Sequence, residues 1–174
     1  MNRTSRRAAV LATVVLTTLA AVAPDAAATF PGRNDLIAFQ ADIGDNGPQI
    51  FTVRSNGHEL RQIQRFITDR GGPDPNVSPD GRKISFKGPP DGALFVANID
   101  GSGIVQVSPS ISVTYKHDWS PDGQHLVVSD NSDPAPDEAV NIVTVRPDGS
   151  DWTYLTHFQA GFRANVGGYS PDGQ

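Results

Sequence analysis

A four-residue turn motif recurs three times along the chain and constrains the fold more than any other feature of the sequence. A second marker, (Asp/Asn)-Gly, alternates with it at Asn56, Asp100 and Asp148. Two markers that keep the same phase indicate an internal repeat, so most of the chain consists of similar units. The turn motif is Ser-Pro-Asp-Gly, at intervals of 42 and 50 residues: Ser78, Pro79, Asp80, Gly81; Ser120, Pro121, Asp122, Gly123; and Ser170, Pro171, Asp172, Gly173.

Each unit contains about four short runs of β-branched and aromatic residues bounded by turn residues, which is the pattern of strands. Within the motif, Pro suits the second position of a type I turn and Asp bonds to local backbone N–H groups. Gly accepts the left-handed conformation that closes a hairpin. The expected strands are 74–78, 83–87, 93–99 and 104–107 in the second unit, and 115–120, 125–130, 141–145 and 153–156 in the third.

Four strands per unit at this period are typical of β-propeller blades, which stack face to face because one blade alone cannot bury both faces. The sequence therefore predicts an all-β partial propeller of about three four-stranded antiparallel blades. They are expected at 33–66, 74–109 and 115–157, with 165–174 as the first strand of a fourth. Since propellers usually close with roughly four to eight blades, we interpret the chain as a truncated product or fragment. Its open blade edges predict self-association.

The first 28 residues have the composition of a secretory signal peptide. Arg3, Arg6 and Arg7 precede an apolar stretch over 8–23, and 26–28 is a run of alanines. The apolar stretch is too short to span a bilayer core of about 30 Å comfortably. We expect a cleaved signal at 1–28, a partial propeller over 29–174, no membrane span after cleavage, and a secreted or periplasmic location. The start of a twin-arginine motif leaves the export route open.

Composition excludes several classes of function. The chain has no Cys, which rules out disulfides, thiolate metal sites and cysteine nucleophiles. Its formal net charge of −5 argues against nucleic acid as a partner, since nucleic-acid binding normally shows a basic patch.

The segment from Trp119 to Val128, Trp-Ser-Pro-Asp-Gly-Gln-His-Leu-Val-Val, resembles the WD-repeat-like propeller blade of the TolB family. The later Asp-Gly-Ser turn at 148–150 and the Leu-Thr pair at 155–156 follow the same pattern. Val77 and Tyr169 stand where the blade motif prefers Trp. The resemblance covers Asp35 to the C-terminus and implies a bacterial envelope protein that contacts other envelope proteins. Similar propellers also belong to prolyl-oligopeptidase-like peptidases and to polysaccharide lyases, which are the enzymatic alternatives.

No catalytic constellation is recognisable, and we expect no cofactor. Ser170 follows Gly168 as in a nucleophile elbow, but Asp172 stands where that motif needs glycine. His117 and Asp118 precede Trp119 in the first strand of a blade, which in a propeller can line the central channel, although a structural role is favoured for them. A weak Ca²⁺ candidate is the acidic loop containing Asp130, Asp133, Asp137 and Glu138, for which a solvated insertion is favoured.

The function expected from the sequence is binding rather than catalysis. Propellers bind protein or small ligands through loops on a rigid framework. We therefore expect a secreted, non-catalytic scaffold whose partners are other extracytoplasmic proteins or a small ligand. Arg61, Arg65 and Arg70 are candidate contacts for an acidic partner, although a solvated face is their default interpretation. The recurring aromatic side chains are expected to pack between blades.

Overall fold

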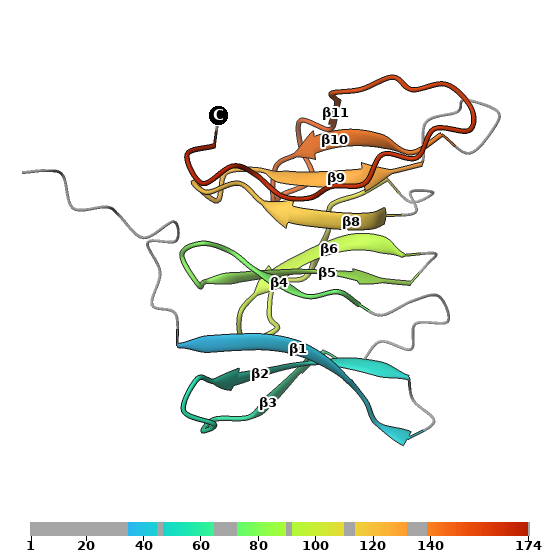
Figure 1. Cartoon of the computed structure of the whole chain (residues 1–174). Coiled ribbons are helices and arrows are strands. Elements are labelled where there is room, and N and C mark those ends of the chain that lie inside the picture. The colour runs from blue at the N-terminus through green and yellow to red at the C-terminus, as the bar shows by residue number, and fades with distance from the viewer. Residues whose placement is uncertain are drawn as a thin grey trace, which may run out of the picture.

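The computed structural model describes residues 35–44, 47–64, 73–89, 92–109, 114–131 and 139–173. These ranges contain eleven strands in three antiparallel sheets and no α-helix (Figure 1). They accordingly include no helix of the length and apolarity needed to cross a membrane. The expected signal peptide at 1–28 lies outside the described residues.

The sheets follow one another in chain order, and we call them blades 1, 2 and 3. Blade 1 is three-stranded, and blades 2 and 3 are four-stranded. This confirms the all-β partial propeller that the repeat predicts. The strands are β1 (Leu36–Asp42), β2 (Pro48–Arg54) and β3 (Arg61–Gln64); β4 (Asn76–Val77), β5 (Lys83–Gly88), β6 (Ala93–Asn98) and β7 (Val105–Gln106); and β8 (Thr114–Trp119), β9 (Leu126–Asp130), β10 (Asn141–Val145) and β11 (Thr153–Tyr154).

The central hairpin of every blade has the same register. Phe39 lies opposite Phe51 in blade 1, and Phe86 lies opposite Phe95 in blade 2. Val128 lies opposite Val143 at the equivalent position of blade 3. Because a shift of one residue would turn every side chain to the other face of the sheet, this shared register gives the three blades the same two faces.

The Ser-Pro-Asp-Gly turns are closed by a repeated set of hydrogen bonds. Ser120 Oγ donates to Asp122 Oδ1 at 2.6 Å and accepts from the His125 N–H at 2.9 Å, while the Gly123 N–H donates to the Ser120 carbonyl at 2.8 Å. Hydrogen bonds from Ser120 and the Gln124 N–H lower the pKa of Asp122 from its ordinary value. The turn at 78–81 has the same bonds. The motif thus joins the innermost strand to the next strand in the same way in blades 2 and 3.

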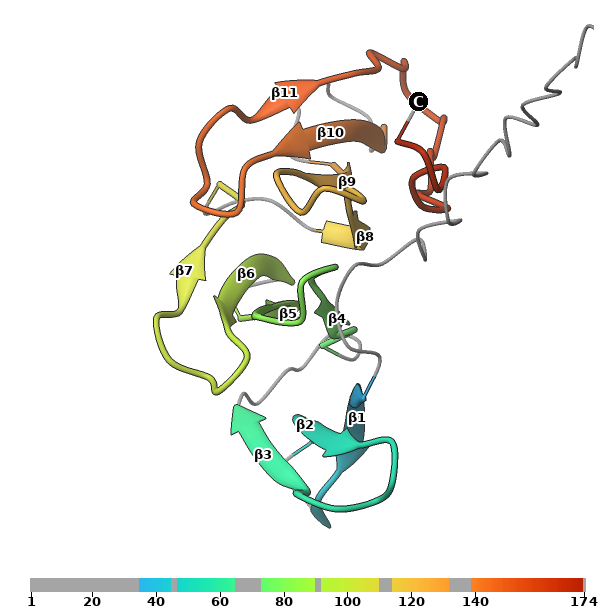
Figure 2. The same ribbon diagram turned by 90° about the vertical axis from the view of Figure 1, so that its left-hand side faces the viewer.

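Apolar contacts between neighbouring blades form the core. One cluster joins blades 1 and 2 through Ile50, Ile84 and Phe86, with Ala38 and Ile63 packed against it. The cluster between blades 2 and 3 is larger and contains Leu94, Val96, Val107, Trp119, Leu126, Val128, Val143 and Val145. Figure 2 shows the result: the blades follow an arc with β3, β7 and β11 on its outer side and β4 and β8 on its inner side.

Candidate functional site

The innermost strands β4 and β8 bring polar side chains of different blades together. The Asn76 amide Nδ2 donates to the His117 carbonyl at 3.1 Å and lies 3.3 Å from His117 Nε2. The Asn76 carbonyl in turn accepts from Trp119 Nε1 at 3.2 Å. Asn76 therefore fixes β8 against β4 and holds the His117 ring on the inner side of the arc.

His117 is buried and uncharged at neutral pH. Its side chain is 5% exposed, and burial lowers its pKa to about 4, against the opposing influence of the Asp74 carboxylate. Since the Asn76 amide is a donor, Nε2 is its acceptor and Nδ1 carries the proton. Nδ1 has no hydrogen-bond partner among the described residues. The nearby Ser85 backbone acts against the lowering of the His117 pKa.

Charged groups surround the same position. Asp74 lies 3.2 Å from Lys116 Nζ and 3.8 Å from Lys87 Nζ. Burial lowers the pKa of Lys87, Asp74 opposes the shift, and the nearby Lys116 adds to it. The Asp74 N–H also donates to Gln40 Oε1 of blade 1 at 3.1 Å. Asp74 thus contacts all three blades at the inner side of the arc, blades 2 and 3 through its carboxylate and blade 1 through its backbone N–H.

These groups line a cavity of about 360 Å³, which we call the inner cavity. Its lining combines two blades with the chain that follows β11: Asp74, Asn76, Lys116, His117, Asp118, Val166 and Gly167. The inner cavity offers a carboxylate and an ammonium group beside a neutral imidazole, which suits a polar ligand.

His117 and Asp118 line the inner cavity together but make different contacts. Successive side chains of a strand point to opposite faces, and Asp118 faces away from Asn76. Its Oδ1 accepts the Trp119 N–H at 2.9 Å, and its Oδ2 would lie 2.8 Å from a Cβ added at Gly168. The φ of +134° at Gly168 favours glycine at this position beside β8.

The acidic loop candidates are only partly described. Asp130 is fully buried and accepts a hydrogen bond from Tyr154 Oη at 3.1 Å, so it connects β9 to β11. Asp133, Asp137 and Glu138 lie outside the described residues. Across the described ranges, no group of three or more His, Cys, Asp or Glu residues is arranged to hold a metal ion.

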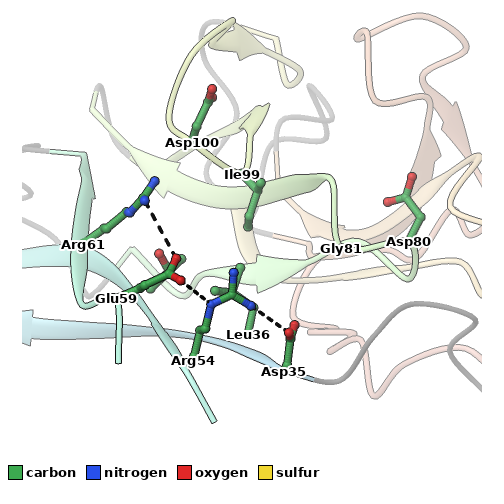
Figure 3. A pocket seen from close by; sticks show the side chains of 10 residues that line it. Asp35, Leu36, Arg54, Glu59, Arg61, Asp80, Gly81, Ile99 and Asp100 are labelled. Carbon is green, nitrogen blue, oxygen red and sulfur yellow. Dashed lines mark hydrogen bonds and ion pairs between the residues drawn. The ribbon is translucent and has the colours of Figure 1, made fainter. Parts of the chain in front are cut away.

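A second cavity, also of about 360 Å³, lies between blades 1 and 2 at the end that carries the hairpin turns. Figure 3 shows Arg54 at its wall between two carboxylates, with Asp35 Oδ2 2.7 Å from Nη1 and Glu59 Oε1 2.8 Å from Nε. The hydrogen bond to Arg54 lowers the pKa of Glu59. Arg61, a candidate contact for an acidic partner, lies 3.8 Å from Glu59. Arg65 and Arg70 are outside the described residues.

The ion pair between Arg54 and Glu59 at the second cavity has an equivalent in another blade. Blade 3 has the same arrangement, with Arg146 Nε 2.6 Å from Asp151 Oδ2. Glu59 and Asp151 share a positive φ, at 55° and 58°, and Gly103 has the corresponding conformation in blade 2 at 62°. Because the same ion pair occurs at the same place in blades 1 and 3, it is explained by blade geometry, and the inner cavity is the better candidate for a specific site.

The architecture and the solved structures that resemble it define the class of protein as a β-propeller. The chain matches a protein described as TolB from Agrobacterium tumefaciens with a TM-score of 0.63 and 20% identity, over 80% of this chain and 52% of that one. TolB from Acinetobacter baumannii matches with a TM-score of 0.62 and 19% identity, over 80% of this chain and 33% of that one. The resemblance to TolB propellers is thus confirmed at the level of the fold.

A third similar structure is a prolyl endopeptidase, with a TM-score of 0.57 and 16% identity, over 81% of this chain and 24% of that one. The chain therefore spans about half of the first TolB structure and smaller parts of the other two proteins. No protein-family model and no curated protein matches the chain.

Proposed function

We propose that the chain is an exported, non-catalytic propeller module that binds a small polar ligand, or a polar side chain of a protein, at the inner cavity. The observation that carries this proposal is the convergence of Asp74, Asn76, Lys116 and His117 from two blades on one cavity. Each is held by strand pairing or by a hydrogen bond across the blade boundary. Groups positioned in advance by a rigid framework lose little entropy when a ligand binds.

The inner cavity predicts which residue binding depends on. We expect a small-molecule screen, read by amide chemical shifts, to find polar ligands that perturb Lys116, His117 and Gly167. Replacing Lys116 by alanine should weaken such a ligand about tenfold, which corresponds to about 1.4 kcal/mol, because a charged hydrogen-bond donor is lost. Lys83→Ala is the matched control, since Lys83 lines a different cavity. Equal weakening by both variants would contradict the assignment.

Export is the second part of the proposal and is supported by the leader pattern of residues 1–28. Expression of the full chain in a bacterium should give a mature protein that begins at Thr29 and fractionates outside the cytoplasm. N-terminal sequencing of the purified protein measures this directly. A protein that retains Arg3–Arg7 and stays in the cytoplasm would contradict it.

An enzymatic alternative is favoured by one observation, the match to a prolyl endopeptidase. In this alternative the chain is the propeller portion of a peptidase. A Gly-x-Ser-x-Gly segment encoded downstream of Gln174 would support the alternative over the binding module.

A further inference from the structure

The inner cavity has a cationic end. Lys116 Nζ and Lys87 Nζ lie 3.2 Å and 3.8 Å from the same carboxylate oxygen of Asp74. One carboxylate therefore faces two ammonium groups, and these three groups together carry one positive charge. The Lys116 side chain is 58% exposed and lines the cavity, so its ammonium group has donors left for a ligand.

Asp118 gives the same cavity an anionic group, two residues along β8 from Lys116. Its side chain is partly buried, and its Oδ1 accepts the Trp119 N–H. Its Oδ2 makes no hydrogen bond or ion pair with the residues that the structure describes. Gly168 leaves that oxygen uncovered, because a Cβ at 168 would lie only 2.8 Å from it. Asp118 is therefore a carboxylate with one oxygen available to a ligand.

The blade repeat does not account for this carboxylate. Counted from the Ser-Pro-Asp-Gly turns, Asp118 is equivalent to Asn76. The Asn76 amide donates to the His117 carbonyl of β8, which a carboxylate cannot do. Asp74 and Lys116 are equivalent by the same count, and they carry opposite charges. The charges of the inner cavity thus differ between blades, whereas the turn carboxylates are bonded in the same way in both.

The two charged ends are close enough for one small ligand. Residues two apart in an extended strand, as Lys116 and Asp118 are in β8, have Cα atoms about 6–7 Å apart. The cavity volume of about 360 Å³ is within the range of small-molecule pockets. A ligand that bridges the two side chains therefore needs an anionic and a cationic group only a few bonds apart.

A ligand with a single charge fits this arrangement poorly. An anion that binds Lys116 would also face the carboxylate of Asp118. A cation that binds Asp118 would face the two lysines around Asp74. Bringing like charges together in a partly desolvated site costs binding free energy. A zwitterion avoids both costs, because it pairs with each end.

We propose that the inner cavity binds a small zwitterion of the α-amino acid class, with its carboxylate on Lys116 and its ammonium group on Asp118. This inference names the ligand class of the proposed site and therefore rests on the proposed function. His117 and Val166, which also line the cavity, are the uncharged groups beside the ligand. The two charged contacts set its orientation.

Titration of the purified full chain with an equimolar mixture of the protein amino acids is the first test. At least one member should shift the backbone amide signals of Lys116, His117 and Gly167. The member that binds is then compared with its amide, which lacks the carboxylate, and with its N-acetyl derivative, which lacks the ammonium group. Each derivative should bind at least about tenfold more weakly, because it loses one charged hydrogen bond.

Two variants assign each charge to one end of the ligand. Lys116→Ala should weaken the amino acid and its N-acetyl derivative but not the amide. Asp118→Asn should weaken the amino acid and its amide but not the N-acetyl derivative. Asparagine keeps an oxygen for the Trp119 N–H and is the residue at the equivalent position 76, so the fold should be retained, which urea denaturation checks. Lys83→Ala, in a different cavity, should change none of the three affinities.

The inference is overturned if no amino acid shifts these signals, if either derivative binds as tightly as the amino acid, or if the two variants weaken all three ligands alike. The proposed function is judged separately, by the wider screen of polar ligands. It stands if that screen still perturbs Lys116, His117 and Gly167, and it fails together with the inference if nothing in the screen does.

Discussion

Replacing Gly101 by alanine is expected to lower the free energy of unfolding by about 3 kcal/mol. Two costs combine at this position. Gly101 has a φ of +86°, where an L-residue is strained by about 1–2 kcal/mol. The added Cβ would also lie 2.6 Å from the Ile63 carbonyl, and that atom belongs to the backbone of the neighbouring blade, so it cannot rotate away.

Gly81→Ala separates the two costs. Gly81 also has a positive φ, +72°, but a Cβ there meets no atom within 4 Å. Only the conformational strain applies, so a loss of about 1 kcal/mol is expected. Urea denaturation of both variants gives the comparison. Equal losses would show that the contact between the blade 2 hairpin and β3 does not limit stability.

Local turn chemistry explains why the sequence predicts the blades so well. The Ser-Pro-Asp-Gly motif forms its hydrogen bonds within six residues, as at Ser120 and His125, so distant parts of the chain hardly affect it. The central strands follow closely: 141–145 is expected and observed, and the run expected at 83–87 is observed as Lys83–Gly88.

The innermost and outermost strands of blade 2 are shorter than the sequence suggests. The runs expected at 74–78 and 104–107 become Asn76–Val77 and Val105–Gln106. Each of these strands pairs on one side only, so its hydrogen bonding depends on how closely it follows a single neighbour. Apolar pattern alone does not contain that information.

The inner cavity could be predicted only in part. The position of His117 and Asp118 in the first strand of a blade indicates the channel side, and the structure places both at the cavity. Asn76, Asp74 and Lys116 escape sequence reasoning, because Asn76 reaches His117 across 41 residues and no local motif marks it. Its one available signal is the repeat, since Asn76 and Asp118 occupy equivalent positions in their pairs with β5 and β9.

The buried imidazole of His117 makes stability depend on pH in a defined window. Its pKa is about 4 in the folded chain, against an ordinary value of 6.5. Between these values the unfolded chain binds a proton that the folded chain does not, so stability rises with pH. The full contribution is present above pH 6.5 and is lost as the pH falls toward 4. The expected loss over that window is about 3 kcal/mol.

Carboxylates titrate in the lower part of the same window, so the measurement needs a variant that lacks only the imidazole. His117→Gln has no titrating ring and retains an oxygen that can accept from the Asn76 amide. Its stability should be lower than that of the wild type at pH 7. As the pH falls, it should not lose the contribution that the wild type loses through protonation of His117. Urea denaturation of both proteins from pH 7 to pH 4 then gives two curves that converge as the pH falls. Parallel curves would mean that His117 has the same pKa in the folded chain as in the unfolded chain, and that its position beside Asn76 between β4 and β8 does not keep the ring uncharged.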